Sequence, residues 1–358
     1  GYTVAVFHEI ATPREPSSCD TGYLWCVPWR CRLIQLNECL KNTRVGVIGA
    51  GYLGQYHAEK YAAMESVDLV GIVDIDADRA NDIAYRTNTQ AFTGLNDLIG
   101  KVDAVSIATP TPLHFEIGQA MLNAGIHVLI EKPISTNLEE ARVLIDLAES
   151  RNLVLQVGHL ERFNPAVVAV QDMINKPLFI ESHRLNVYSG RSTDVSVVLD
   201  LMIHDIDIIF NFVDSEVNTI HASGAAVVSD HCDIANARIE FKSGCVANIT
   251  ASRISTKNQR KIRLFQNTGY IAVDFSKCEI VYIKQAHVPK ETLIPGTEVH
   301  QFCFSEGDAL GEELRSFVGA VSACREPVVT GRMGYQALAV ALDVMDQIDE
   351  TACRFGDL

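Results

Sequence analysis

The sequence predicts an α/β protein of two domains, a parallel sheet followed by a second α/β domain with a large, open and mostly antiparallel sheet. The chain has 358 residues, more than one ordinary domain requires. Short apolar strands alternate with helices over residues 44–157, which indicates right-handed βαβ units. From residue 158 strands follow one another with little helix between them, as in antiparallel sheets. We therefore expect an extension over 1–43, a first domain over 44–157 and a second over 158–358.

The composition is that of a globular protein and argues against several classes of partner. Hydrophobic residues make up 47% of the chain and charged residues 21%, and no apolar run approaches the length of a membrane span. A formal net charge of −15 disfavours nucleic acid as a partner. Ten cysteines scattered over a chain of this length indicate reduced thiols. We therefore expect a cytoplasmic protein that binds neither nucleic acid nor membrane.

Residues 1–43 differ from the rest of the sequence. Both tryptophans, Trp25 and Trp29, and four of the ten cysteines lie there. No two of these cysteines have the C-x-x-C spacing of a zinc ribbon, and no basic segment precedes an apolar core as in a secretory signal. We expect a variable extension without a metal site, and a folded part that begins near Thr43.

In the first domain the apolar pattern sets the expected elements. The expected strands are Val45–Ile48, Leu69–Asp74, Val102–Ala108, His127–Ile130 and Leu153–Val157. The expected helices are Tyr56–Met64, Ala77–Arg86, Phe115–Asn123 and Leu138–Ser150.

In the second domain Asn164 is a good N-cap and Pro165 suits the first helical position, so a helix should run to about Met173. The expected strands are Phe179–Tyr188, Asn218–Val227, Ala235–Phe241, Val246–Ile254, Ile262–Gln266, Tyr270–Phe275 and Ile280–Ile283. Lys242–Gly244 and Asn267–Gly269 are hairpin-turn signals. Helices at about 196–213, 308–323 and 334–349 are expected to cover one face of this sheet.

A glycine motif joins the first expected strand to the first helix. It has the spacing G-x-G-x-x-G, with Gly49 for the tight turn, Gly51 for close approach of a pyrophosphate and Gly54 for helix–strand packing. Tyr52 and Leu53 lie within it, where free N–H groups at the helix start hold phosphates. The motif predicts a Rossmann domain that binds a dinucleotide; the alternative is a flavodoxin-like domain without one.

Asp74 closes the next strand, 20 positions after Gly54. That spacing suits a carboxylate that accepts hydrogen bonds from an adenosine ribose. Asp74 would repel a 2′-phosphate and no arginine follows it directly, so the sequence favours NAD over NADP as cofactor.

Glu131-Lys132-Pro133 ends a buried strand. Pro133 favours an extended backbone at Lys132, so the ammonium should leave the carboxyl end of the strand, where open α/β sheets bind ligands. Beside an oxidised nicotinamide, Lys132 would stabilise developing alkoxide character, and its pKa would fall through desolvation. The alternative is a Glu131–Lys132 pair on a loop.

The segment from Val197 to Val213 is apolar on nearly all sides, which predicts a buried helix. Four polar residues recur at i, i+4, i+7 and i+11 and so share one face: Asp200, His204, Asp207 and Asn211. Asp205 lies off this face. Buried carboxylates and histidines are costly unless they are paired or functional.

His204 titrates near neutrality, so it would take a substrate hydroxyl proton as the hydride leaves. Asp200, one turn earlier, would orient the ring or bind a substrate hydroxyl. One alternative is an internal network that only fixes helix packing. Another is a metal site of Asp200 and His204 with His159 or His183, which no dense ligand motif supports, so we expect no metal.

Further candidates lie in segments expected at the cleft. His159, Arg162 and Asn164 follow the last parallel strand, where Arg162 would clamp a phosphate or carboxylate of a substrate, or form a salt bridge at the domain hinge. Arg191 belongs to a polar loop that would close over the substrate or simply connect elements. Thr109, Pro110 and His114 follow another strand end, where His114 would approach the nicotinamide or only begin a helix. The predicted cofactor set is therefore Gly49, Gly51, Tyr52, Leu53, Gly54, Asp74, Thr109, Pro110, His114, Glu131 and Lys132.

From about residue 44 to the end, the chain resembles the Gfo/Idh/MocA family, which includes glucose–fructose oxidoreductase and inositol dehydrogenase. The resemblance rests on the glycine loop Gly49–Gly54, on Glu131-Lys132-Pro133 and on Asp200-Leu-Met-Ile-His204. It implies that Lys132 and His204 lie beside the nicotinamide and the substrate, and that Asp200 helps to bind the substrate.

Within that family, Val157–Pro165 and Asp200–Asp207 look like the sugar-nucleotide dehydrogenases. The resemblance implies oxidation of the C3 hydroxyl of UDP-N-acetylglucosamine to a ketone, for lipid A or surface polysaccharide. The alternatives are a polyol dehydrogenase acting on a substrate such as myo-inositol, and an NAD-binding sensor without turnover. A sheet with one face uncovered also predicts a homo-oligomer, a dimer or a tetramer.

Overall fold

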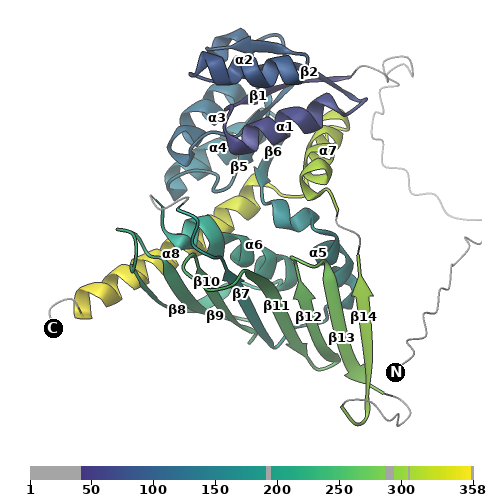
Figure 1. Cartoon of the computed structure of the whole chain (residues 1–358), viewed down its shortest axis with the longest axis vertical. Helices are drawn as coiled ribbons and strands as arrows, with labels where there is room; N and C mark the ends of the chain where they lie inside the picture. Colours follow the sequence, from purple (N-terminus) through teal and green to yellow (C-terminus); the bar gives the residue numbers. More distant parts are fainter. Residues whose placement is uncertain (1–41, 191–194, 287–293, 305–306, 356–358) are drawn as a thin grey trace, which may run out of the picture. The chain divides into compact units, whose positions relative to one another are not determined.

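The computed structural model describes residues 42–190, 195–286, 294–304 and 307–355. The strands of these residues form two β-sheets (Figure 1). The first has six parallel strands in the order β3-β2-β1-β4-β5-β6, and the second has eight strands in the order β14-β13-β12-β11-β7-β10-β9-β8. The predicted fold class, a Rossmann-type parallel sheet followed by a large and mostly antiparallel sheet, is confirmed.

The first sheet follows the alternation expected from the sequence. Its strands are β1 (Thr43–Ile48), β2 (Val67–Val73), β3 (Gln90–Phe92), β4 (Ala104–Ile107), β5 (His127–Glu131) and β6 (Leu155–Gly158). Its helices are α1 (Tyr52–Ala62), α2 (Ala77–Arg86), α3 (His114–Asn123) and α4 (Leu138–Ser150). Because β1 pairs with both β2 and β4, the strand order reverses there, and open α/β sheets bind ligands at such a point.

Side-chain caps explain why two of these helices begin where the sequence predicts. Asp76 accepts from the N–H groups of Asp78 and Arg79 at the start of α2, and Asn137 accepts from that of Glu140 at the start of α4. By contrast, α1 begins at Tyr52 rather than at the expected Tyr56, directly after Gly51 and without a side-chain cap. Its first turn is largely exposed, so apolar periodicity could not locate it.

The second sheet carries the longer strands. They are β7 (Phe179–Leu185), β8 (Val217–Ala225), β9 (Ile234–Phe241), β10 (Val246–Ser252), β11 (Gln259–Gln266), β12 (Gly269–Asp274), β13 (Glu279–Gln285) and β14 (Thr297–Cys303). Neighbouring strands are antiparallel except β7 and β10, which are parallel. The predicted hairpins across Lys242–Gly244 and Asn267–Gly269 are confirmed. The short β3 and the edge strand β14 were not predicted.

The remaining helices are α5 (Pro165–Val170), α6 (Ile203–Phe212), α7 (Ala309–Ser322) and α8 (Gly331–Phe355). Short 3₁₀ turns occur at Leu95–Asp97, Thr111–Leu113, Leu160–Phe163 and Gln171–Met173. The Asn164 side chain caps α5 by accepting from the N–H of Ala166, as predicted. No helix in the described ranges combines the length and the apolar character needed to cross a bilayer.

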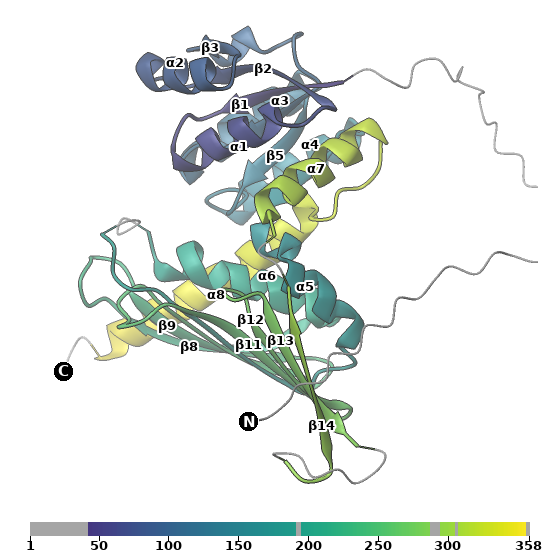
Figure 2. The ribbon, with the colours of Figure 1, turned by 45° about the vertical axis from the view of Figure 1, so that its right-hand side comes forward.

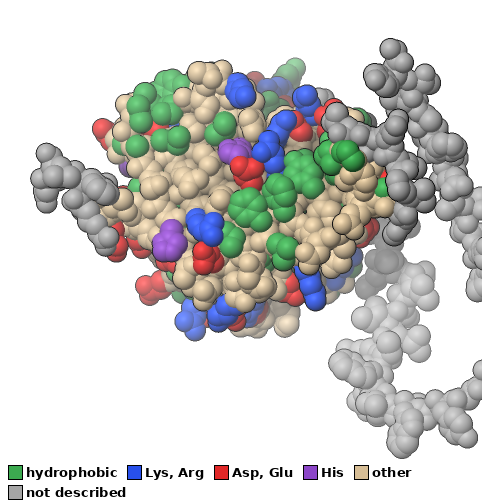
Figure 3. Space-filling model, turned by 90° about the horizontal axis from the view of Figure 1, so that it is seen from below, with side chains coloured by type: hydrophobic (Ala, Val, Ile, Leu, Met, Phe, Trp, Pro, Cys, Tyr) green, Lys and Arg blue, Asp and Glu red, His purple; other side chains and the backbone are tan. Residues whose placement is uncertain are grey.

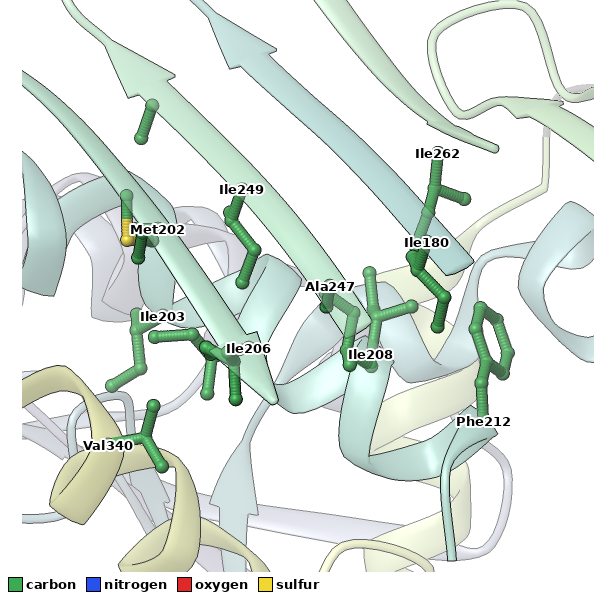
Figure 4. Close-up of a cluster of buried hydrophobic side chains, with 14 of the residues drawn as sticks. Ile180, Met202, Ile203, Ile206, Ile208, Phe212, Ala247, Ile249, Ile262 and Val340 are labelled. Atoms are coloured by element: carbon green, nitrogen blue, oxygen red, sulfur yellow. The ribbon is translucent and has the colours of Figure 1, made fainter. Parts of the chain in front are cut away.

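One face of the second sheet packs against α5, α6 and α8 (Figure 2). Ile180, Ile249 and Ile262 on the strands meet isoleucines of α6, including Ile206 and Ile208 (Figure 4). All five are at most 1% exposed. This core supports α6 and therefore holds the polar face predicted on that helix.

The prediction that the segment 308–323 covers the second sheet is wrong. Helix α7 instead buries Leu314 and Phe317 against the first sheet, in one cluster with Val45, Val47 and Tyr61. An amphipathic pattern specifies that one face of a helix is buried, but not which sheet buries it. Residues after β14 therefore complete the core of the nucleotide-binding sheet.

The segment predicted as one helix over 196–213 has a break in its regularity. Val198–Met202 forms a π-helical turn, and α6 follows from Ile203. Such turns are frequent at functional sites. Asp200 lies within the turn and His204 in the first turn of α6, so both predicted residues lie at the same end of this segment.

Candidate active site

The glycine loop has the geometry that dinucleotide binding requires. Gly49 has φ +101°, and a Cβ there would lie 2.5 Å from the carbonyl oxygen of Ala108. A Cβ on Gly54 would lie 1.8 Å from the carbonyl oxygen of Gly49, so only glycine lets α1 approach β1. Gly51 has open space in front of it, which leaves room for a phosphate at the start of α1.

The predicted ribose ligand lies beside this loop. Asp74 Oδ2 accepts from the N–H of Ala50 at 2.6 Å, and Oδ1 accepts from that of Asp76 at 2.8 Å. These bonds tie the carboxylate at the end of β2 to the glycine loop. The Arg79 Nη2 atom lies 3.9 Å from Asp74 Oδ1, while its Nε donates to Asp76 at 2.8 Å.

A cleft of about 410 Å³ lies over the carboxyl ends of β1, β2 and β4. Its walls include five residues of the predicted cofactor set, with Ile75 and Leu113 beside them: Gly49, Gly51, Asp74, Thr109 and Pro110. The Thr109 Oγ1 atom is buried without a hydrogen-bond partner among the described residues. A largely apolar cleft with the Asp74 carboxylate at the end of β2 and an open glycine loop fits an adenosine diphosphate group.

Tyr52 and Leu53, also in the predicted cofactor set, lie in the first turn of α1. They are 62% and 40% exposed, and the Tyr52 ring meets that of Tyr56 edge-on. Their main-chain N–H groups, rather than their side chains, are the parts suited to hold a phosphate.

His114 bridges two loops instead of presenting a free nitrogen. Its Nδ1 lies 2.8 Å from the carbonyl oxygen of Pro133 and its Nε2 lies 2.8 Å from that of Thr109. The ring is buried, and burial lowers its pKa although both carbonyl groups favour the charged form. The structure therefore supports the less specific alternative, in which His114 begins α3 and holds the loops after β4 and β5 together.

Lys132 projects from the end of β5, as predicted, and meets the π-helical turn. Its Nζ donates to the main-chain carbonyl of Asp200 at 2.7 Å and lies 3.8 Å from Asp200 Oδ1. The following peptide bond, Lys132–Pro133, is cis. Burial lowers the pKa of Lys132, and the charges of Asp200 and Glu131 act in the opposite direction.

His204 belongs to the same group. Its pKa is held well below the ordinary value, first by burial and then by the charges of Lys132 and Arg184. Its Nδ1 is buried without a partner among the described residues. A neutral imidazole beside a lysine with a lowered pKa is an arrangement that can accept a proton.

Glu131 turns away from Lys132 toward the interior. Its Oε1 accepts from His57 Nε2 at 3.1 Å, and His57 Nδ1 lies 2.9 Å from the hydroxyl of Ser106. Both His57 and Ser106 have no exposed surface, and Glu131 is 8% exposed. This placement argues against the predicted contact of the Glu131 side chain with the cofactor, because the carboxylate is already hydrogen-bonded to His57 on helix α1.

Two predicted substrate ligands are held in structural roles. Arg162 donates from Nε and Nη2 to Asp207 at 2.6 and 2.8 Å, and from Nη1 to Asn211 at 2.5 Å. Its guanidinium is therefore hydrogen-bonded to two side chains of α6, which supports the predicted alternative of a salt bridge. Asn164 caps α5 and donates toward Glu161 at 3.4 Å, so its side chain is occupied as well.

A second buried arginine, Arg184, was not predicted from the sequence. Arg184 on β7 donates from Nε to Asp205 at 2.7 Å and from Nη1 to Glu161 at 2.8 Å. The Ser182 hydroxyl also donates to Asp205 at 2.8 Å. This network explains why Asp205 lies off the predicted face of α6: it faces the sheet.

His159 lies 1% exposed at the end of β6, and neither ring nitrogen has a hydrogen-bond partner among the described residues. Its Nδ1 is 3.9 Å from Asp207 Oδ2, and burial lowers its pKa. Arg191 lies outside the described residues. In the part of the chain that the structure describes, no three His, Cys, Asp or Glu side chains are grouped to hold a metal ion.

A parallel sheet with a glycine loop, a carboxylate after β2, and a lysine and a histidine at the carboxyl end defines an NAD-binding oxidoreductase. Family models agree with this class. The model described as the oxidoreductase family with an NAD-binding Rossmann fold matches residues 43–159, and the GFO/IDH/MocA C-terminal domain matches residues 177–272. The chain belongs to the Gfo/Idh/MocA family.

Individual relatives show the same likeness. The chain is 38% identical over 304 residues to UDP-N-acetylglucosamine 3-dehydrogenase of Acidithiobacillus ferrooxidans, which covers 84% of this chain and 96% of that protein. The solved structure of that enzyme superposes with a TM-score of 0.83 over 86% of this chain and 98% of the other, at 37% identity. Myo-inositol 2-dehydrogenase of Thermotoga maritima is 26% identical over 86% of this chain and 96% of its own.

A solved structure of scyllo-inositol dehydrogenase from Lactobacillus casei, with bound NAD(H) and scyllo-inositol, shares the fold. Its TM-score is 0.73 at 21% identity, over 87% of this chain and 98% of that chain.

Proposed function

We propose that this oxidoreductase uses NAD to oxidise the C3 hydroxyl of UDP-N-acetylglucosamine to a ketone. The observation that carries the dehydrogenase chemistry is the contact of Lys132 with the Asp200 turn, beside a neutral His204. The likeness to the Acidithiobacillus enzyme supports this substrate over a polyol. A free polyol such as myo-inositol is the second candidate, favoured by the less similar inositol dehydrogenases.

In the proposed reaction, oxidised NAD accepts the hydride from the substrate carbon. Lys132 lies where its ammonium would stabilise the alkoxide that develops on the hydroxyl oxygen. His204, neutral at neutral pH because its pKa is lowered, would accept the hydroxyl proton. Asp200 would orient the substrate hydroxyl while its main chain holds Lys132.

The substrate is tested by steady-state NADH production with UDP-N-acetylglucosamine, UDP-glucose and myo-inositol as parallel substrates. We expect turnover with UDP-N-acetylglucosamine and a kcat/KM at least about a hundredfold lower for myo-inositol, which lacks the nucleotide to bind. Mass spectrometry should find a product two hydrogen atoms lighter. Turnover of myo-inositol alone would replace this proposal with the polyol activity.

The preference for NAD rests on Asp74. The variant Asp74→Ala removes hydrogen bonds to the ribose worth roughly 1–3 kcal/mol and should raise the Kd for NAD by about 5- to 150-fold. Because Arg79 already lies beside this carboxylate, the same variant should gain affinity for NADP. Asp68→Ala, an exposed position on β2, is the matched control. An unchanged Kd for NAD in Asp74→Ala would remove Asp74 from the site.

We further propose that the protein is a homo-oligomer that pairs through the second sheet. The face of this sheet opposite α5, α6 and α8 carries apolar rings and charged pairs (Figure 3). Phe265 packs between Phe179 and Tyr270 there and is 38% exposed, beside the ion pair of Arg263 with Glu181. Aromatic rings among charges of both signs suit a self-complementary interface. A monomer in sedimentation equilibrium would contradict the proposal.

A cytoplasmic location is proposed from the thiols. Cys232, Cys245, Cys303 and Cys324, among the described cysteines, are free thiols, and burial raises the pKa of Cys245 to about 11. Such thiols suit a reducing compartment. Recovery of the enzyme in the membrane or secreted fraction of its host would contradict this.

A further inference from the structure

A layer of buried polar side chains separates the first sheet from helices α1 and α7. Its members are at most 8% exposed, and they are His57 and Tyr61 on α1, Ser106 on β4, Glu131 on β5, Gln156 on β6 and Glu313 on α7. Ser106 pairs with Leu129, and Leu129 with Gln156, so these side chains share one face of the sheet. Glu131, two residues beyond Leu129, shares it too. The layer adjoins Lys132, because Lys132 directly follows Glu131 in the chain.

One half of this polar layer is satisfied by hydrogen bonds. His57 bridges Ser106 at 2.9 Å and Glu131 at 3.1 Å, and the Tyr61 hydroxyl lies 3.3 Å from that of Ser106. His57 Nε2 donates to the Glu131 carboxylate and Nδ1 contacts the Ser106 hydroxyl, so both ring nitrogens have partners. The carboxylate next to Lys132 is therefore fixed in direction.

The other half is not satisfied by the described residues. Both carboxyl oxygens of Glu313 and the Oε1 atom of Gln156 are buried without a partner there, although Gln156 Nε2 donates to the main-chain carbonyl of Glu313 at 3.3 Å. Glu313 has no exposed surface. An ionised carboxylate in this position would be strongly destabilising, so the side chain is a neutral acid. Burial, with the charges of Glu131 and Asp207, raises its pKa well above the ordinary value.

We propose that Glu313 is a positioning residue that controls the charge behind Lys132: a buried acid whose loss of a proton places a second carboxylate beside Glu131. The proposal rests on the dehydrogenase function proposed above. The ionisation is a simple proton loss to solvent, with no other reactant. A second negative charge would stabilise the Lys132 ammonium and delay the release of its proton.

Charged and titratable groups reach Glu313 from each element packed around it. They are Tyr61 on α1, Glu131 on β5 and Asp207 on α6, and Asp207 is itself paired with Arg162 and lies 3.9 Å from His159. Arg162 and Asp207 neutralise each other at 2.6 Å. The net influence on Glu313 therefore comes from Glu131, the same group that acts on Lys132.

The test compares pH profiles of kcat/KM for hydroxyl oxidation in the wild type, Glu313→Gln, Glu313→Asp and Glu312→Gln. Glutamine is isosteric with the neutral acid and cannot ionise, so the limb that reports Lys132 should move to lower pH by about half a unit or more. Glu313→Asp keeps a carboxyl group and should restore the wild-type profile. Glu312→Gln removes an exposed carboxylate on the same helix and should leave the profile unchanged. Superimposable profiles for the wild type and Glu313→Gln would overturn the proposal.

A second readout does not depend on turnover. The infrared difference spectrum between the wild type and Glu313→Gln should contain the C=O band of a protonated carboxyl group at neutral pH, and this band should fade on alkaline titration. Absence of the band overturns the proposal even if the enzyme is fully active. A wild type that oxidises none of the tested alcohols while showing the band overturns the proposed function but leaves the buried acid in place. Should Glu313→Gln fail to fold, the difference from Glu313→Asp gives the same information, because shortening the side chain shifts the band.

Discussion

The two ends of the polar face around α6 use the same kinds of residue in opposite ways. At the far end, Asp207 and Asn211 occupy Arg162 through three hydrogen bonds of 2.5–2.8 Å. The Arg162 and Asp207 side chains are 6% and 1% exposed. Every nitrogen of the Arg162 guanidinium has a partner, so we call this end the closed network, although Asn211 Nδ2 has no partner among the described residues.

At the cleft end, Lys132 meets Asp200 through one hydrogen bond to the main chain, with the carboxylate at 3.8 Å, and a ring nitrogen of His204 has no partner among the described residues. Charges that are fully paired hold a structure together, whereas incompletely paired ones can exchange a proton or a partner. Burial and charge alone therefore do not distinguish the two ends; the pairing of the cation does, because Arg162 has three hydrogen bonds and Lys132 has one among the described residues.

The largest effect is expected on kcat when Lys132 is replaced at the cleft end. Lys132→Ala should lower kcat by roughly 10²- to 10⁴-fold, because the developing alkoxide loses its stabilising charge, while the Kd for NAD changes only a few-fold. Stopped-flow and fluorescence titration measure the two quantities, with Lys60→Ala as the control, since Lys60 is a half-buried lysine on α1 that pairs with Asp308. If Lys132→Ala kept its biological effect and its NAD affinity, the protein would be a sensor rather than an enzyme.

The closed network should respond in stability rather than chemistry. Arg162→Met leaves Asp207 buried without its partner, so the free energy of unfolding should fall by about 3–5 kcal/mol. The double variant Arg162→Met/Asp207→Leu should lose less free energy of unfolding than the sum of the losses in the two single variants. Urea unfolding measures both. A stable Arg162→Met protein with a raised KM for the sugar nucleotide would instead make Arg162 a substrate ligand.

His159 lies between the two ends, and its response to pH tests the comparison. Burial lowers its folded pKa below the unfolded value of about 6.5, so its contribution to stability is present above that pH and lost as pH falls toward the folded pKa. His159→Phe should therefore show a smaller loss of stability between pH 7 and pH 5 than the wild type. Thermal unfolding across this range measures the difference; an equal slope would mean that the pKa of His159 is the same in the folded and the unfolded protein.

The smallest effect is expected at an exposed pair. Arg332 and Glu149 form a bidentate salt bridge at 2.7 Å, but their side chains are 68% and 51% exposed. Arg332→Met should change the free energy of unfolding by no more than about 1 kcal/mol. A loss comparable to that of Arg162→Met would show that burial is not what separates these pairs.

Local patterns predicted the elements that carry the site. The glycine loop, the strand ending in Lys132 and the helix with His204 are each specified by residues within a few turns of one another, and the structure places Lys132 and Asp200 together as expected. The N-cap predicted at Asn164 is also observed, at the start of α5.

The partners of the buried polar groups could not be predicted, because they come from distant segments. His57 and Glu131 are 74 residues apart, and Gln156 and Glu313 are 157 apart. The direction of Glu131, the pairing of Arg162 and the destination of α7 all depend on such contacts. His57, a titratable residue on the buried face of α1, is a local sign of this polar layer that the sequence analysis did not use.

The late position of α7 in the chain has a consequence for synthesis. The helix supplies Leu314 and Phe317 to the core beneath β1, yet it is translated more than 150 residues after the last strand of that sheet. A nascent chain that has just left the ribosome with β6 finished therefore still exposes an apolar surface on its nucleotide-binding half. The core of that half is complete only when the C-terminal segment has emerged. Truncated or stalled chains should therefore fold poorly and bind chaperones.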